Sequence, residues 1–404
     1  MRPLFINVLN LIVLGYFLAI TNSSYGAWIQ KAPFGGTAKH RCMGFSIGNK
    51  GYIGGGHINS GITVNYKDFW EYDPATNSWS QIADFGGGYR YHGTAFTVGN
   101  YGYVGLGENE NSEYKNDFWK YIPLINTWVQ VADFPADPRR GACSFVIDDT
   151  AYVGTGQADT GYKTDFYKYS YTTNTWIPIA PFIGEARSSA VAFSNNGKGY
   201  VGTGHVIGND TKDFYCYDPI SDSWLQKADA GLTNRQDATG FVINGIGYIG
   251  TGNDVAGDYN FDDFWAYNFD TDTWSQIADF DGQGRRYMVS FIINNVAYCG
   301  TGTNGTNFRD FWAFVPFLSN EKSTQNHQLS VFPNPSVDYI TIDFNQEVSA
   351  KVSIYDVSGQ LILDKHLQGT FFQITKDLTG PGAFTYRVEF KNGELKNGKF
   401  IFLE

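Results

Sequence analysis

The sequence predicts an all-β protein built mainly from a repeated unit, and three observations support this prediction. Aromatic residues make up 17% of the 404 residues, with 27 Tyr and 32 Phe, and there are also 47 Gly. Charged residues account for only 17%, which excludes a disordered chain or a coiled coil. Tryptophan recurs six times at intervals of 48 to 51 residues, and a fixed period of this length is the signature of a structural repeat.

Residues 1–26 are predicted to be a signal peptide. Arg2 supplies a positive charge, and the segment from Leu4 to Ile20 is apolar except for two asparagines. This segment is too short and too interrupted to span a membrane. The small residues Ser24 and Gly26 place the expected cleavage before residue 27. We therefore expect an exported mature chain without a transmembrane segment.

Every repeat carries the same sequence pattern. Seventeen residues after each of the six tryptophans stands a phenylalanine, and seven residues later a tyrosine opens a Gly-rich block. An Asp-Phe-aromatic triplet follows, and turn residues separate short stretches of alternating apolar residues. This alternation indicates four short strands per repeat. The tryptophans are Trp28, Trp79, Trp128, Trp176, Trp224 and Trp274; the register phenylalanines are Phe45, Phe96, Phe145, Phe193, Phe241 and Phe291; the register tyrosines are Tyr52, Tyr103, Tyr152, Tyr200, Tyr248 and Tyr298.

The order of these residues resembles the kelch motif, a β-propeller repeat in which a Gly-rich block, an Asp-aromatic pair and a later Trp follow one another. The resemblance covers residues 27–315 and implies a six-bladed kelch-type β-propeller. The chain starts with a fourth-strand sequence at Trp28, and its last copy ends at Phe314 without one. We therefore expect the N-terminal strand to complete the last blade and close the ring. All ten tryptophans fall at repeat positions, so we expect them to be structural.

The end of the chain differs in kind. Residues 316–328 are mostly polar and are predicted to be a linker, and residues 329–404 contain no Trp or Cys and alternate as strands, which indicates a small β-sandwich. Phe332-Pro333-Asn334-Pro335, Tyr355-Asp356-Val357-Ser358-Gly359-Gln360 and the end from Lys399 resemble the C-terminal sorting domain of the type IX secretion system of Bacteroidota. The resemblance implies interaction with the type IX machinery and a secreted or surface-attached protein.

Two positions of the repeat are candidate ligand-binding positions, because both lie where the 2–3 and 4–1 strand connections share one face of a propeller. Each repeat also has an Asp in its triplet. One of the two positions is basic in every repeat. Its Lys and Arg residues either pair with these acids or form an anion-binding mouth, and both interpretations are open. The basic set, six residues before each register phenylalanine, comprises Lys39, Arg90, Arg139, Arg187, Arg235 and Arg285; the polar set, five residues after each register tyrosine, comprises His57, Glu108, Gln157, His205, Asn253 and Thr303.

The predicted function is binding of an unknown glycan or protein ligand, with an anionic ligand as one option. The net charge of −11 argues against nucleic acid as a partner. The alternative is a glycan-active enzyme such as a sialic-acid mutarotase-like sugar isomerase, in which Glu108 would act with His57 or His205. We expect no metal and no cofactor: a copper site is disfavoured because the two histidines fall in blades one and four, and the Gly-rich blocks precede no helix.

Two further expectations concern isolated side chains. His40 and His92 adjoin the basic set and are predicted to be solvated residues at the channel mouth. The four cysteines occupy four different repeat positions, which is not the pattern of a recurring disulfide framework. We expect free, buried thiols, with one bridge between neighbouring blades as the alternative.

Overall fold

The structure is a computed structural model that describes residues 26–59, 61, 63–255, 259–316, 329–357, 360–391 and 395–403. The predicted signal peptide, apart from Gly26, and nearly all of the predicted linker lie outside these residues. The chain divides into two compact units, Met1–Phe317 and Leu318–Glu404. Among the described residues, no helix has the length and apolar character needed to cross a membrane.

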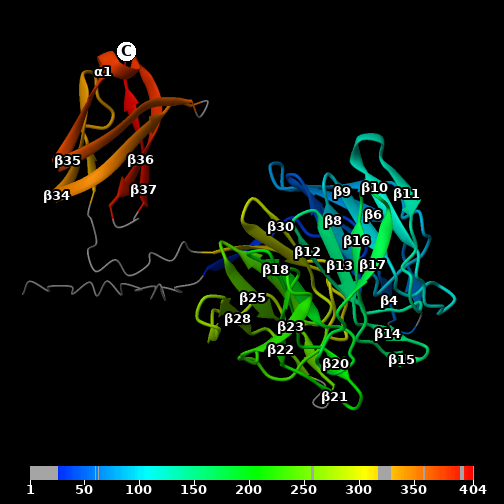
Figure 1. The fold of residues 1–404 in the computed structure, drawn as a ribbon. Coiled ribbons are helices and arrows are strands. Elements are labelled where there is room, and N and C mark those ends of the chain that lie inside the picture. Colours follow the sequence, from blue (N-terminus) through cyan, green and yellow to red (C-terminus); the bar gives the residue numbers. More distant parts are fainter. Residues whose placement is uncertain are drawn as a thin grey trace, which may run out of the picture. The chain divides into compact units, whose positions relative to one another are not determined.

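The first unit is a six-bladed β-propeller of four-stranded antiparallel sheets (Figure 1). The first strands of neighbouring blades contact one another in a closed ring, so they surround a central channel. Blade one is β2(Met43–Ile47), β3(Lys50–Gly54), β6(Phe69–Asp73) and β7(Ser78–Ile82); blade two is β8(Thr94–Val98), β9(Tyr101–Gly105), β10(Phe118–Ile122) and β11(Thr127–Val131); blade three is β12(Cys143–Ile147), β13(Thr150–Gly154), β16(Phe166–Ser170) and β17(Thr175–Ile179). Blade four is β18(Val191–Asn195), β19(Lys198–Gly202), β22(Phe214–Asp218) and β23(Ser223–Lys227); blade five is β24(Thr239–Ile243), β25(Ile246–Gly250), β28(Phe264–Asn268) and β29(Thr273–Gln276); blade six is β30(Val289–Ile293), β31(Val296–Gly300), β32(Phe311–Val315) and β1(Ala27–Lys31).

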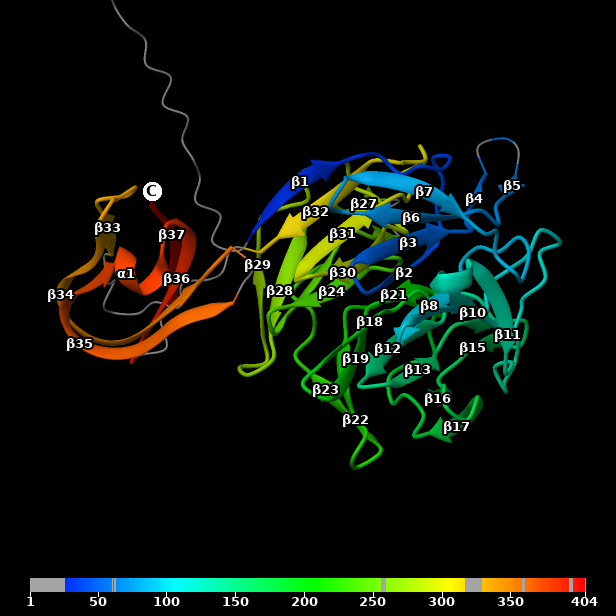
Figure 2. The same ribbon diagram turned by 90° about the horizontal axis from the view of Figure 1, so that it is seen from above.

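The N-terminal strand closes the ring, as the sequence predicts. Strand β1 pairs antiparallel with β32 from Ala27 opposite Val315 to Lys31 opposite Phe311. Figure 2 shows β1, in blue, beside β32, in yellow, although the two strands stand almost 300 residues apart in the sequence. The ends of the propeller chain are therefore held within one sheet, and β32 has the outer partner strand that the third strand of every other blade has.

The periodic tryptophans lie between blades, which confirms their structural role. Trp128 of blade two packs against Phe69 and Phe85, with ring centroids 4.9 and 5.1 Å away. Its indole Nε1 donates a hydrogen bond to the carbonyl of Ala83. Trp79, Trp176, Trp224 and Trp274 make the equivalent hydrogen bond to Ala32, Ala132, Ala180 and Ala228. Large aromatic rings in these positions bury the surface that holds neighbouring blades together.

The second unit is a β-sandwich-like domain with a separate core. Its sheet has the order β33(Ser330–Phe332), β34(Tyr339–Tyr355), β36(Gly382–Phe390), β37(Leu395–Phe402), and β35(Leu361–Thr375) pairs with β34. The one helix described here, α1(Lys376–Thr379), follows β35. β33 pairs with the first half of β34 and β36 with its second half. On the other edge of β34, the register with β35 shifts between Asp343 and Val348. Ile340, Val352 and Phe400 are among the fully buried core residues.

Candidate functional site

The basic set is buried and paired. None of the six side chains is more than 1% exposed, and each lies 2.5 to 2.7 Å from the Asp of the triplet in its own blade. The pairs are Lys39–Asp68, Arg90–Asp117, Arg139–Asp165, Arg187–Asp213, Arg235–Asp263 and Arg285–Asp310. Buried cations need such partners, because desolvation of an unpaired charge is costly.

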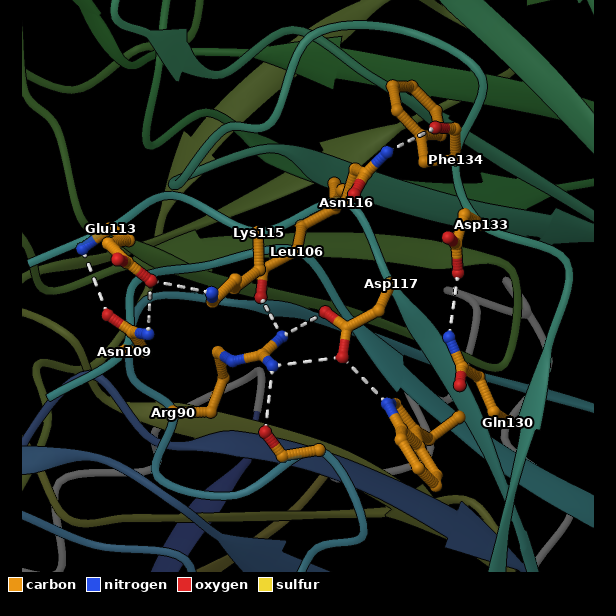
Figure 3. A network of polar contacts seen from close by, with 12 residues as sticks. Arg90, Leu106, Asn109, Glu113, Lys115, Asn116, Asp117, Gln130, Asp133 and Phe134 are labelled. Carbon is orange, nitrogen blue, oxygen red and sulfur yellow. Dashed lines mark hydrogen bonds and ion pairs between the residues drawn. The ribbon is translucent and has the colours of Figure 1, made fainter. Parts of the chain in front are cut away.

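Blade two shows how the two terminal nitrogens of the cation are engaged (Figure 3). Arg90 Nη1 donates to Asp117 Oδ1 at 2.7 Å and to the Leu106 carbonyl at 2.8 Å, and Nη2 donates to Asp117 Oδ2 and the Gly87 carbonyl, both at 3.0 Å. Trp119 Nε1 donates to the same carboxylate at 2.7 Å. The geometry therefore supports the interpretation of the basic set as structural pairs. The basic set does not form an anion-binding mouth, because the terminal guanidinium nitrogens that would bind an anion already donate hydrogen bonds within the blade.

Charge pairing also controls the acids. Burial alone would raise the pKa of Asp213 and of Asp310, but the hydrogen bonds and positive charges of Arg187 and Arg285 outweigh it. The pKa of each carboxyl is therefore held below its usual value, so both remain ionised at neutral pH. This matches a scaffold role, since the pairs are charged and complete without a ligand.

The polar set lies at the roots of the 2–3 loops, on the face where the sequence places it. Each member forms a β-bridge with the residue five positions before the register phenylalanine of its own blade. In four blades the set member opens a short hairpin. These hairpins are β4(His57–Ile58) with β5(Val64–Asn65), β14(Gln157–Ala158) with β15(Gly161–Tyr162), β20(His205–Val206) with β21(Asn209–Asp210), and β26(Asn253–Asp254) with β27(Tyr259–Asn260). Glu108 and Thr303 occupy the same position in blades two and six.

The structure brings three members of the polar set together. His57 stacks on the ring of Tyr91 with centroids 4.1 Å apart, and the Tyr91 hydroxyl hydrogen-bonds Glu108. Arg140 Nη1 donates to Glu108 Oε2 at 2.7 Å, and Nη2 donates to Gln157 Oε1 at 3.1 Å. Blades one to three are thus linked at this face by a continuous polar contact network.

His205, the third residue of the catalytic alternative, belongs to a different group of contacts. Its Nδ1 lies 2.7 Å from Asp210 Oδ1, and its ring packs edge-on against Tyr162 at 5.6 Å. Asn253 and Thr303 lie in blades five and six, bridged to Gln236 and Arg286. The polar set therefore surrounds the channel mouth and does not form a single pocket.

His40 is buried, so its prediction as a solvated residue is wrong. It is only 2% exposed, its Nδ1 lies 2.7 Å from Asn307 Oδ1, and its Nε2 lies 2.9 Å from His57 Nε2. Arg41 Nη1 lies farther from His57 Nε2, at 3.5 Å. Since the Asn307 oxygen accepts, the two shorter contacts assign the His40 proton to Nδ1 and make His57 Nε2 the donor to His40. Burial lowers the pKa of His40 to about 4 and that of His57 to about 3, with the Arg41 charge adding to both shifts. Both rings are neutral at pH 7.

The residues at the channel axis were missed by the sequence analysis. They stand four positions before each register phenylalanine, and all have left-handed backbone with φ between 55 and 60°. Five backbone N–H groups in this ring donate to the carbonyl of the preceding blade's residue at 2.8 to 3.2 Å. The six positions hold Arg41, His92, Gly141, Ser189, Asp237 and Tyr287. We call the five side chains other than Gly141 the axial cluster.

The axial cluster joins side chains from five blades. Arg41 Nη2 donates to the Tyr287 hydroxyl at 2.5 Å, and Tyr287 and Ser189 hydrogen-bond the Asp237 carboxylate. His92, from blade two, reaches Ser189 Oγ at 3.1 Å and lies 3.9 Å from Asp237 Oδ1. Its side chain therefore crosses the channel axis toward blades four and five. The sequence does hold a signal for this position: it carries a different residue type in every repeat, although it stands two residues after the repeated base of the basic set.

His92 is also less solvated than predicted, with a side chain 14% exposed. Burial lowers its pKa well below the ordinary value, and the charges of Arg41 and Arg140 lower it further. Burial raises the pKa of Asp237, against which the positive charge of Arg41 acts. Gly141 leaves room for His92, because a Cβ there would lie 3.0 Å from His92 Nε2 and the ring would have to move by a few tenths of an ångström.

A cavity of about 240 Å³ lies at the axial cluster. Its wall is lined further inside by small residues one position before each register phenylalanine, namely Gly44, Ala95, Ser144, Ala192, Gly240 and Ser290. Since a water molecule occupies roughly 30 Å³, this space suits a few waters or one small polar molecule. A second cavity, of about 350 Å³, lies farther along the inner strands, and Ser46, Thr97 and Ser194 help to line it.

The cysteines and the acids supply no further site. All four cysteines are free thiols, and Cys143, Cys216 and Cys299 are buried. Within the described ranges, no group of three or more His, Cys, Asp or Glu side chains is placed to hold a metal ion. The polar chemistry of the propeller is thus concentrated at the axial cluster and the polar set around it.

Comparisons with known proteins separate the two units. The propeller is similar in fold to a solved structure titled "Structure of YjhT", with a TM-score of 0.58 and 18% sequence identity over 70% of this chain and 96% of that chain. A comparison with curated protein sequences gave no match. Residues 330–403 match the family described as a secretion system C-terminal sorting domain. The protein is therefore secreted through the type IX system, to be attached to the cell surface or released, and its last unit is the domain that interacts with the type IX machinery.

Proposed function

We propose that the protein is a secreted kelch-type propeller whose function is to bind a glycan or protein ligand at the channel mouth that carries the 2–3 and 4–1 loops. One observation carries this proposal: buried polar atoms of Arg41, His92 and Asp237 at this mouth have no hydrogen-bond partner among the described residues. These three residues also line the cavity at the axis, unlike the residues of other buried unpaired atoms such as Arg90 Nε and Thr251 Oγ1. Unpaired buried polar groups destabilise a fold unless a bound molecule satisfies them. The polar set surrounds the same mouth.

The positions of the charged side chains at the mouth decide which class of ligand is favoured. An anionic glycan or acidic protein would need cations at the mouth, and the basic set is committed to its aspartates. Arg41, Arg140 and Arg286 remain nearby, but Arg140 is bonded to Glu108 and Gln157 and Arg286 donates to Asn260. Support for an anionic ligand is therefore weaker than for a glycan or protein surface rich in neutral polar groups.

A second candidate function is the sugar isomerase. His57 and Glu108 are favoured for it because both contact Tyr91, and because His57 Nδ1 is a buried acceptor without a partner in the described structure. His205 is not part of this group. If a bound sugar were also a substrate, NMR of its anomeric protons would show faster interconversion with the protein than with a His57→Gln variant.

The binding proposal is tested with the full mature chain on an array of neutral and acidic glycans and acidic peptides. We expect at least one class to bind, and we expect Arg140→Ala to weaken binding about tenfold or more, because it releases both Glu108 and Gln157. The matched control is Ser194→Ala, which alters the second cavity. Absence of any ligand, or equal loss in both variants at unchanged thermal stability, would contradict the proposed binding face.

The sorting domain yields a separate prediction. Residues 329–404 fused to the C-terminus of an exported reporter should carry that reporter outside the outer membrane of a host with type IX secretion. The same reporter without the fusion should stay in the periplasm, as should the fusion in a host that lacks the secretion system. Cell fractionation and protease accessibility on intact cells measure the outcome. A periplasmic fusion protein in the competent host would refute the independence of this domain as a sorting signal.

A further inference from the structure

The axial cluster holds more hydrogen-bonding atoms than its own contacts use. Arg41 Nε, His92 Nδ1 and Asp237 Oδ2 are buried and have no partner within the described part of the chain, and the same is true of His57 Nδ1 and Asn253 Oδ1 in the polar set beside it. Buried polar groups in folded proteins are nearly always paired. Arg41, His92 and Asp237 line the same cavity, whereas other buried unpaired atoms, such as Arg90 Nε and Thr251 Oγ1, belong to residues outside its lining. Three unpaired atoms around one cavity therefore indicate a site that another molecule completes.

The hydrogen bonds within the cluster fix the polarity of these atoms. His92 Nε2 lies 3.1 Å from Ser189 Oγ and 3.9 Å from Asp237 Oδ1, and a proton on Nε2 is stabilised by both oxygens. His92 consequently carries its proton on Nε2 and a lone pair on Nδ1. By the contacts described above, His57 also exposes a lone pair at Nδ1. Asp237 Oδ2 is an acceptor and Arg41 Nε–H is a donor, so acceptors outnumber donors.

This polarity selects a class of ligand. An anion offers only acceptors, which in this cavity would face the lone pair of His92 and the carboxylate of Asp237. A hydroxyl group both donates and accepts, so neighbouring hydroxyls on one molecule can donate to these acceptors while one accepts from Arg41. The charges of Arg41 and Asp237 balance each other, and the cavity they line measures about 240 Å³. A small, neutral and hydroxyl-rich molecule fits the excess of acceptors, the balanced charge and the volume of the cavity.

We propose that the axial cluster binds a neutral sugar, with Asp237 and His92 accepting hydrogen bonds from its hydroxyls and Arg41 donating one. This inference rests on the proposed binding function and names the chemical class of its ligand. It also accounts for Gly141, since a side chain at this position would displace His92. The small residues deeper in the channel leave the space open, and the axial side chains make it selective.

The test uses isothermal titration calorimetry and saturation-transfer NMR on the mature chain, with neutral hexoses, the matching uronic acids and fully O-methylated hexoses as probes. We expect a neutral hexose to bind, its O-methylated form to bind at least tenfold more weakly because it cannot donate, and its uronic acid to bind no better than the parent sugar. Asp237→Asn should weaken binding of the hexose about tenfold or more. Asp229→Asn removes the same charge at an exposed position and should leave binding unchanged.

A second variant guards against a folding defect in Asp237→Asn. Five other residue types adopt the left-handed backbone at this position of the ring, so Gly141→Ala should fold at a cost of about 1–2 kcal/mol. Its Cβ would lie 3.0 Å from His92 Nε2, and the resulting shift of His92 should weaken hexose binding. Hexose binding that survives both folded variants would overturn the inference, and so would tighter binding of the uronic acid. If acidic ligands bind and depend on Arg140 alone, the proposed binding face stands and the neutral-sugar site fails. If no probe or array ligand binds, both proposals fail.

Discussion

Removal of residues 27–32 should open the propeller and lower its stability by more than any single substitution. These residues supply strand β1, the fourth strand of blade six, and its five paired positions with β32. Trp28 is 7% exposed and lies about 5 Å from the rings of Phe264, Phe280 and Phe314. A buried aromatic of this size contributes about 4–6 kcal/mol to the free energy of folding through burial.

The point substitution Trp28→Ala isolates the side chain and should cost about 3–5 kcal/mol. Its control is Ile29→Ala on the same strand, because Ile29 is 44% exposed and should cost little. Urea and thermal unfolding of the mature chain measure both effects. An unfolding midpoint that does not change when residues 27–32 are absent would show that the ring closes without β1.

Arg285→Ala should lower stability and leave the affinity for a ligand unchanged per folded molecule. The Arg285 side chain is fully buried and its guanidinium holds both oxygens of Asp310. Breaking a buried pair by removing one partner typically costs about 3–5 kcal/mol, because it leaves the other charge uncompensated. The loss should lie toward the lower end, since Asp310 keeps some contact with water.

Lys198→Ala serves as the matched control, because the Lys198–Asp218 pair is solvent-exposed and such pairs contribute about 0–1 kcal/mol. Unfolding curves report stability, and titration with a ligand from the array reports affinity. The opposite pattern, with affinity lost and the unfolding midpoint retained, would return the basic set to the ligand-binding role.

The fold could be predicted because its signals are local and repeated. Trp79, Phe96 and Tyr103 recur at fixed offsets, and each repeat must bury these rings against the next one. The orphan strand at Trp28 predicted closure for the same reason, since a four-stranded repeat that lacks one strand must find it elsewhere. The family match at 330–403 likewise agrees with three motifs that follow one another in order along this part of the sequence.

The site was predicted less well. The basic set was noticed because it repeats, and repetition turned out to mark a structural pair, as in Arg90–Asp117. The polar set was placed correctly around the mouth, but His57 and His205 do not share contacts. The sequence gives the position of each residue within its blade. It does not give which of these side chains are long enough to meet at the axis.

The sequence by itself determined the period, the four strands of each blade, the closing strand and the sorting domain, because each depends on residues that are neighbours in the chain or recur at a constant offset. Only the tertiary structure decided where the functional chemistry lies. Arg41, His92 and Asp237 stand 51 and 145 residues apart along the chain, and ring closure turns them toward one axis. There the side chains of blades one, two and five meet, since the left-handed backbone of each inner-strand entry and the space beside Gly141 allow it.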